Sequence, residues 1–281
     1  MRNKSAVRNQ AVRRLLTHAR YEVLPTASTE EKVLAAVPLD VPVTVTASAT
    51  KGLEATLLLS EAFAKHGYVV VPHLAARMIH DRHELTEICD RLGDAGISRV
   101  FVPGGDADAV GDYPDAFSLL EDLLALDKPF EQVGITGYPE THPKITDDLT
   151  VQAMWDKRRH ATHVVSNLTF DAGAIKAWVG RMRGRGITMP LLLGLPGPVD
   201  RTKLLTMATK IGVGESTRFL AKNKGTFLRL AAPGGYTGES FLLACADVAA
   251  RPESLIEGLH VFTFNQIAET EAWRQELLSR L

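Results

Sequence analysis

The sequence predicts a single-domain (β/α)8 barrel, and three observations support this. Short β-rich runs alternate with amphipathic helical stretches, eight such runs occur, and no linker, repeat or low-complexity segment divides the 281 residues. An open doubly wound sheet is the alternative, but that fold has no ready use for eight regularly spaced strands. We therefore expect a closed parallel barrel, with functional residues where its strands end.

The first 20 residues are basic and contain no acidic side chain. They resemble a transit peptide only loosely, and we expect a basic N-terminal helix or arm. The barrel is then expected over residues 21–281. Its eight predicted strands are Tyr21–Leu24, Pro42–Thr46, Tyr68–Val71, Arg99–Val102, Gln132–Ile135, His163–Ser166, Pro190–Leu193 and His260–Phe264.

Helical spacing of apolar residues separates these strands. The clearest helical stretches are Leu53–Lys65, His83–Asp94, Phe117–Leu126, Ala172–Arg183 and Arg201–Lys210. The interval from Gly212 to Gly258 is longer than the others, which predicts extra helices before the last strand. Polar residues or glycine lie at or just after the predicted strand ends: Glu22, Thr46, His73, Asp106, Tyr138 with Glu140 and His142, Asn167, Gly194 and Asn265.

Composition favours a cytoplasmic protein that acts on a small molecule. The net charge is −1 and the pI is near 6.8, so no bulk charge favours nucleic acid or a membrane surface. No apolar run reaches the roughly 20 residues of a membrane helix. Cys89 and Cys245 are far apart, which argues against a disulfide framework or a cysteine zinc site. The sequence leaves a homo-oligomer open.

Glu22 lies within an apolar run, YEVLP, and its side chain should point away from those of Tyr21 and Val23. If it faces the barrel mouth, desolvation would raise its pKa and make it a general acid near neutrality. The structural alternative is a carboxylate paired with an arginine such as Arg20.

The run VFVPGGD ends the fourth predicted strand and presents Asp106 to the rim. Gly104 and Gly105 permit a sharp turn or a close approach to a flat ligand. Neither a P-loop nor a GxGxxG spacing is present, so this is not a phosphate-binding loop of either kind.

A proline-bounded loop, GYPETHP, follows the fifth predicted strand. It presents Tyr138, Glu140 and His142 together, as rigid recognition loops often do. A metal held by His73 with Glu140 and His142 is conceivable, but no HxH or HExxH spacing supports it, and we predict no metal.

Taken in order, these motifs resemble the 5,10-methylenetetrahydrofolate reductase family, from Tyr21 to the C-terminus. The motifs are YEVLP at 21–25, VTVTASAT at 43–50, PHL at 72–74, GGD at 104–106, YPETHP at 138–143, SNLTFD at 166–171 and FTFNQ at 262–266. YPETHP is quite specific, and the ordered set is stronger than any single motif. The resemblance implies a barrel that reduces methylenetetrahydrofolate to 5-methyltetrahydrofolate with NAD(P)H, through a bound FAD.

The resemblance also implies roles for individual residues. Glu22 matches the general acid that helps to open the folate's five-membered ring, and Asp106 matches an aspartate beside the flavin and the pterin. Positions at the flavin or its phosphates fall on Thr46, His73, Gly105, Tyr138 and His142, and on Lys157 if the alignment is gapped. Positions of the substrate shell fall on Asn167, Lys203, Met207 and Gln266.

Departures from the family pattern concern the cofactor and the substrate shell. The arginine that grips the cofactor is Gly104 here, so direct hydride transfer from a nicotinamide is an open alternative to FAD. The family's glutamine and substrate-stacking phenylalanine fall on Lys203 and Met207, and its closing arginine falls on Gln266. A tetrahydrofolate-dependent methyltransferase or demethylase, and a non-catalytic folate-binding relative, are the alternative functions.

Overall fold

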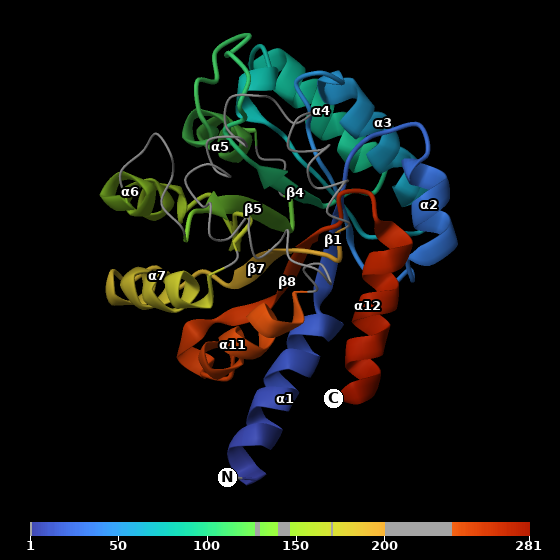
Figure 1. Cartoon of the computed structure of the whole chain (residues 1–281). Helices are drawn as coiled ribbons and strands as arrows, with labels where there is room; N and C mark the ends of the chain where they lie inside the picture. The colour runs from blue at the N-terminus through green and yellow to red at the C-terminus, as the bar shows by residue number, and fades with distance from the viewer. Residues whose placement is uncertain (1, 127–129, 140–146, 170, 200–237) are drawn as a thin grey trace.

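The eight strands form one parallel sheet that curls into a barrel, as predicted (Figure 1). The computed structural model describes residues 2–126, 130–139, 147–169, 171–199 and 238–281. The strands are β1 Ala19–Val23, β2 Val43–Val45, β3 Val70–Pro72, β4 Arg99–Val102, β5 Gln132–Gly137, β6 His163–Ser166, β7 Leu191–Pro196 and β8 Ile256–Phe262. Their order is β3-β2-β1-β8-β7-β6-β5-β4.

The two ends of this sheet meet between β3 and β4. A single bridge joins His73 to Phe101, and the Leu74 N–H donates to the Phe101 carbonyl at 2.8 Å. The Ala76 N–H likewise donates to the Pro103 carbonyl at 3.0 Å. These bonds continue past the end of β3, so the barrel is nearly closed and its carboxyl-end rim is continuous there.

Helices surround the barrel and alternate with its strands (Figure 1). The described helices are α1 Arg2–Thr17, α2 Thr29–Ala36, α3 Gly52–Lys65, α4 Arg82–Asp94, α5 Ala116–Ala125, α6 Asp147–Lys157, α7 Ala172–Gly184, α11 Glu239–Ala249 and α12 Ile267–Arg280, with short 3₁₀ turns η1 Ala76–Met78 and η2 Pro252–Ser254. Helix α11 and η2 supply helical structure before β8, as predicted. The predicted helix Arg201–Lys210 lies outside the described residues.

The basic N-terminal segment forms α1, which packs beside α11, α12 and β8 (Figure 1). Leu15 and Leu16 on this helix are fully buried. Arg14 donates to the carbonyls of Ala249 and Ile256 at 2.7 and 3.1 Å. The helix is thus packed into the fold, and Arg20 already lies in β1 rather than in the preceding segment.

Several predicted strand boundaries differ from the observed ones, and two of these differences affect the candidate site. Strand β1 begins at Ala19 instead of Tyr21, which brings Arg20 into the barrel. Strand β8 ends at Phe262 instead of Phe264, because Phe264 and Asn265 have positive φ angles of 49° and 56°. Two consecutive non-glycine residues in this region turn the chain sharply.

Side chains alternate between the two faces of each strand, so the fold has one core between the sheet and the helices and another inside the barrel. Tyr21, Val23 and other outward-facing residues belong to the large core between the sheet and the helices. Among the described residues, the barrel interior contains one small apolar cluster, formed by Val71, Phe101 and Val165. The remaining space inside is occupied by buried polar side chains, so helix packing provides most of the hydrophobic stabilisation.

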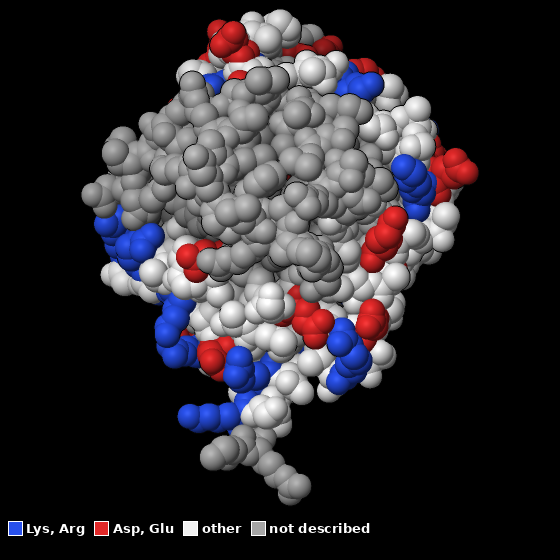
Figure 2. Space-filling model, in the orientation of Figure 1, with Lys and Arg blue, Asp and Glu red and all other residues white. Residues whose placement is uncertain are grey.

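Charged side chains of both signs are interspersed over the described surface shown in Figure 2. None of the described helices is both long and apolar enough to cross a membrane.

Gly134 on β5 makes room inside the barrel. A Cβ atom there would lie 2.8 Å from His163 Nε2 and 2.9 Å from Phe101 Cδ2. We expect Gly134→Ala to lower the free energy of unfolding in urea by about 1–3 kcal/mol, because the barrel interior cannot accept extra volume. Gly180→Ala is the control, since a Cβ at that position in α7 meets nothing within 4 Å. That change should be stabilising, by about 0.5–1 kcal/mol. Equal unfolding midpoints for the two variants would contradict this interpretation.

Candidate active site inside the barrel rim

Glu22 points into the barrel, as the alternation of β1 predicts. Its Oε2 atom lies 2.8 Å from Nε2 of His260 on β8 and 3.6 Å from Nε2 of His73 at the end of β3. The side chain is 16% exposed, so it is enclosed but reachable from the rim. Glu22 is therefore held between two imidazoles, and the direct ion pair with Arg20 that we considered is not formed.

Burial raises the pKa of Glu22 above its ordinary value of 4.5, although nearby His73 and Arg20 oppose this shift. Both neighbouring imidazoles are neutral at physiological pH. Burial lowers the pKa of His73 to about 4 and lowers that of His260 well below its usual range. The contact between Glu22 and His260 is consequently a hydrogen bond between a carboxyl group and a neutral imidazole.

The backbone of Glu22 is fixed by the turn that follows β8. Thr263 donates to the Glu22 carbonyl from its hydroxyl at 2.6 Å and from its N–H at 3.2 Å. The Asn265 side chain accepts from the Leu24 N–H at 2.9 Å and donates to the Leu24 carbonyl at 3.1 Å. The positive φ angles in this turn bring the side chains of Thr263 and Asn265 onto β1. The strained backbone of the turn therefore lies next to Glu22, whose position these bonds fix.

Aromatic rings line the space around the carboxyl group. The rings of His73 and Phe101 are 4.7 Å apart, and His260 meets the half-buried Phe262 edge-on at 4.9 Å. Gly194 on β7 allows this arrangement, because a Cβ there would lie 3.0 Å from Phe262 and 2.1 Å from the Ser166 carbonyl. Flat faces next to a carboxyl group suit a planar heterocyclic ligand.

Several polar atoms beside Glu22 are buried without a hydrogen-bond partner in the described part of the chain. They include the hydroxyls of Thr44 and Thr46 and Nε2 of His73. Thr44 is the register partner of Glu22 on the neighbouring strand β2. Since buried polar groups are rarely left unsatisfied, these atoms mark a place for a polar ligand or bound water.

The loop after β4 carries Asp106, which is exposed at the rim. Gly105 has a φ of +89°, so a residue with a side chain would be strained there. A Cβ on Gly104 would instead meet only the Ala116 nitrogen, at 3.9 Å. Packing therefore does not require glycine at 104, and the missing family arginine is not explained by lack of space.

The other predicted site residues are divided between the rim and the rest of the molecule. Tyr138, Asn167 and Gln266 follow β5, β6 and β8 at the rim, and Thr46 follows β2. Lys157 lies in the last turn of α6, the end of that helix that leads to the start of β6. The Lys157 side chain is partly buried and lies near the carboxylate of Asp115, the residue that precedes α5. Glu140, His142, Lys203 and Met207 lie outside the described residues.

Sequence reasoning missed three buried polar residues inside the barrel: Arg20, His163 and His260. Each alternates with apolar neighbours that face the helices, so the period of two along the strands could have identified them. From the sequence, His163 and His260 are expected only as strand residues, and Arg20 only as a partner for Glu22.

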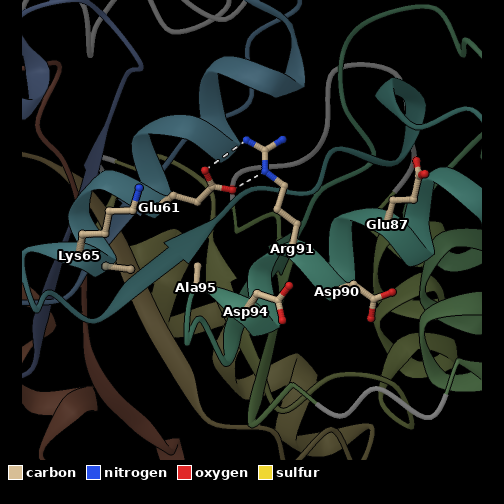
Figure 3. Close-up of a pocket in the computed structure, with 8 residues that line it drawn as sticks. Glu61, Lys65, Glu87, Asp90, Arg91, Asp94 and Ala95 are labelled. Atoms are coloured by element: carbon tan, nitrogen blue, oxygen red, sulfur yellow. Dashed lines mark hydrogen bonds and ion pairs between the residues drawn. The ribbon is translucent and has the colours of Figure 1, made fainter.

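A groove of about 680 Å³ lies on the outside of the barrel between α3 and α4 (Figure 3). It is lined by charged side chains, and its one arginine, Arg91, is bound by Glu54 and Glu61. The groove is formed by helix surfaces and not by strand ends, so we do not assign it to the active site.

Residues 24–220 match the family model of methylenetetrahydrofolate reductase. The match begins two residues after Glu22 and ends before β8, so it includes neither Glu22 nor His260. A GH113 β-1,4-mannanase structure is 9% identical, covers 94% of this chain and 99% of its own, and has a TM-score of 0.51. At that identity it shows the barrel fold only. A protein from Burkholderia cenocepacia J2315, provisionally named a lyase/mutase, is 14% identical over 98% of this chain and 86% of its own, with a TM-score of 0.49.

Glu22→Gln should stabilise the protein, and more so at pH 8 than at pH 5. A carboxyl whose pKa is raised by folding contributes stability below its unfolded pKa and loses it as pH rises through the folded pKa. Glutamine removes that loss, which amounts to about 1.4 kcal/mol for each unit by which folding raises the pKa. Urea unfolding at the two pH values measures the difference.

Glu271→Gln is the matched control, because the sign is opposite. Burial alone would raise the pKa of Glu271, but hydrogen bonds from Arg274, Tyr21 and Gln275 lower it overall. This carboxylate therefore stabilises the fold above its unfolded pKa, and its replacement should destabilise the protein more at pH 8 than at low pH. If Glu22→Gln behaved like Glu271→Gln, the raised pKa of Glu22 would be disproved.

Proposed function

This chain belongs to the methylenetetrahydrofolate reductase family, and we propose that it transfers hydride from NAD(P)H to 5,10-methylenetetrahydrofolate, giving 5-methyltetrahydrofolate. The observation that carries this proposal is Glu22, a carboxyl group buried at the rim beside aromatic rings, with a raised pKa. Such a group is protonated at higher pH than an ordinary glutamate and suits general acid catalysis near neutrality.

In the proposed reaction Glu22 gives its proton to the ring nitrogen of the folate that leaves the one-carbon unit. The bond from that nitrogen to the methylene carbon breaks, and the remaining nitrogen forms a cationic iminium with it. Hydride from the nicotinamide then adds to the methylene carbon, leaving a methyl group and an oxidised nicotinamide. Solvent returns the proton to Glu22. Asp106 is proposed to favour the cationic iminium through its negative charge.

The rim supplies further groups for binding. We propose that the half-buried Phe262 provides a flat surface for the pterin or nicotinamide ring, in place of the family's stacking phenylalanine at Met207. The unpartnered hydroxyl of Thr46 and the imidazole of His73 are proposed to bind polar atoms of the cofactor. Gly105, Tyr138 and His142 remain proposed cofactor contacts from the family pattern, and Asn167, Lys203 and Gln266 remain proposed substrate contacts.

The described residues fit FAD only in part. Thr46 and His73 could contact an isoalloxazine ring, but Gly104 has no side chain with which to make the family's charged contact. Lys157 remains a proposed cofactor contact from the family pattern. We therefore propose direct transfer from NAD(P)H, and no step above passes through a flavin. A nicotinamide held at near-attack distance from the iminium carbon needs no intermediate carrier.

The purified protein should be colourless and should oxidise NADH or NADPH only when methylenetetrahydrofolate is present. Absorbance spectroscopy and product chromatography measure the two outcomes. A yellow protein with a stoichiometric flavin spectrum would overturn direct transfer but not the reductase. Failure to oxidise either nucleotide, with or without added FAD, would overturn the reductase itself.

Glu22→Gln should lower kcat for folate reduction by about 100-fold or more, because the acid is removed while the fold is retained. Glu257→Gln is the matched control, since Glu257 is exposed near the start of β8, away from the rim. Its kcat should equal that of the unsubstituted protein. Folate reduction at an undiminished rate by Glu22→Gln would show that another group is the acid.

A further inference from the structure

A chain of hydrogen bonds runs from Glu22 down into the barrel. His260 Nδ1 accepts from Arg20 Nε at 2.9 Å, and His260 Nε2 lies 2.8 Å from Glu22 Oε2. On the other side of Arg20, an Nη atom lies 3.1 Å from His163 Nε2, and His163 Nδ1 lies 3.0 Å from the hydroxyl of Thr162. Arg20, His163 and His260 are buried.

The arginine fixes the direction of every bond in this chain. A guanidinium has donors only, so Nδ1 of His260 must be an acceptor and its ring proton must be on Nε2. Nε2 of His163 is an acceptor for the same reason, which leaves its proton on Nδ1 toward Thr162. Burial and the Arg20 charge lower the pKa of both rings, to about 3 for His163, so neither gains a second proton at neutral pH.

The fixed Nε2–H of His260 points at one oxygen of Glu22. Oε2 therefore acts as an acceptor, and in a neutral carboxyl group the carbonyl oxygen accepts hydrogen bonds better than the hydroxyl oxygen. The acidic proton is thus favoured on Oε1, for which no described side chain provides a hydrogen bond. His73 also lies nearest Oε2, at 3.6 Å, so it does not compete for Oε1.

We propose that Arg20 is a positioning residue that, by holding His260 in its Nε2–H form, keeps the transferable proton of Glu22 on Oε1. This inference rests on the proposed function of Glu22 as an acid. Within the described part of the chain, no carboxylate contacts the Arg20 guanidinium directly, and one of its Nη atoms has no hydrogen-bond partner. A buried cation placed this way lowers the stability of the fold, and an apolar side chain of similar size would be more stabilising at this position.

The groups that face this chain come from five strands. Glu22 and Arg20 are on β1, His73 follows β3, Arg99 is on β4, His163 is on β6 and His260 is on β8. Burial, with Arg99 nearby, lowers the pKa of Arg20 to about 9, and Glu22 opposes that shift. Arg20 therefore remains charged through the neutral range, in which the acid has to work.

Nitrogen NMR of the full-length protein labelled at histidine tests the first step. The His260 resonances, assigned by loss in His260→Gln, should show a protonated Nε2 and an unprotonated Nδ1 at pH 7. A ring protonated on Nδ1, or on both nitrogens, would overturn the proposal. This measurement needs no activity, so its result is separate from the outcome of the NAD(P)H oxidation assay.

Arg20→Met tests the second step. The His260 ring should then populate both tautomers, kcat for folate reduction should fall by about tenfold to a hundredfold, and KM for the folate should change little. Because the Arg20 charge lowers the pKa of Glu22, the basic limb of the kcat–pH profile should move to higher pH.

Arg274→Met is the matched control, since Arg274 is equally buried but pairs with Glu271 on the helix side of the barrel wall. It should leave the His260 tautomer and the basic limb unchanged. Arg20 would be shown to be only structural if, in Arg20→Met, the basic limb of the kcat–pH profile did not move and the His260 ring kept a single Nε2–H tautomer. If Arg20→Met does not fold, the tautomer of the unsubstituted protein decides the question.

Discussion

The structure depends on burying one carboxyl group between two imidazoles inside a parallel barrel. Glu22 contacts two imidazoles whose own pKa values are lowered by burial, so neither can neutralise it by becoming a cation at physiological pH. Desolvation therefore outweighs the positive charge of Arg20, and the carboxyl group holds its proton more tightly. The aromatic lining, the turn after β8 and the polar chain beneath all serve to maintain this environment.

Each strand has one face toward the helices and one toward the barrel interior, and this arrangement allows a polar interior in a stable fold. Outward-facing residues such as Tyr21 and Val23 join the large core against the helices, and this core supplies most of the hydrophobic stabilisation. The interior is left for groups that cost stability, among them a buried arginine and three histidines. Gly134 and Gly194 provide the space that these larger side chains need. Polar interiors of this kind are typical of functional sites and not of sites selected for stability.

Much of this could be predicted from the sequence, because the signals are local. The alternation of β-rich runs with amphipathic helical stretches predicted the barrel. The apolar neighbours of Glu22 indicated the orientation of its side chain and the raised pKa. The partners of Glu22 could not be predicted in the same way. His260 is 238 positions away, and only closure of the barrel brings β8 beside β1. The end of β8 was also missed, since Phe264 has β propensity but is forced into a left-handed turn by the bonds of Thr263 and Asn265.

The central claim is that Glu22 is protonated near neutral pH, and infrared difference spectroscopy tests it most directly. The spectrum of the unsubstituted protein minus that of Glu22→Gln should contain the carbonyl stretch of a protonated carboxylic acid at pH 7. That band should disappear as pH rises, and it should shift on isotopic labelling of glutamate. If the difference spectrum at pH 7 contains only the carboxylate bands of Glu22, the carboxyl group is ionised and the account is contradicted.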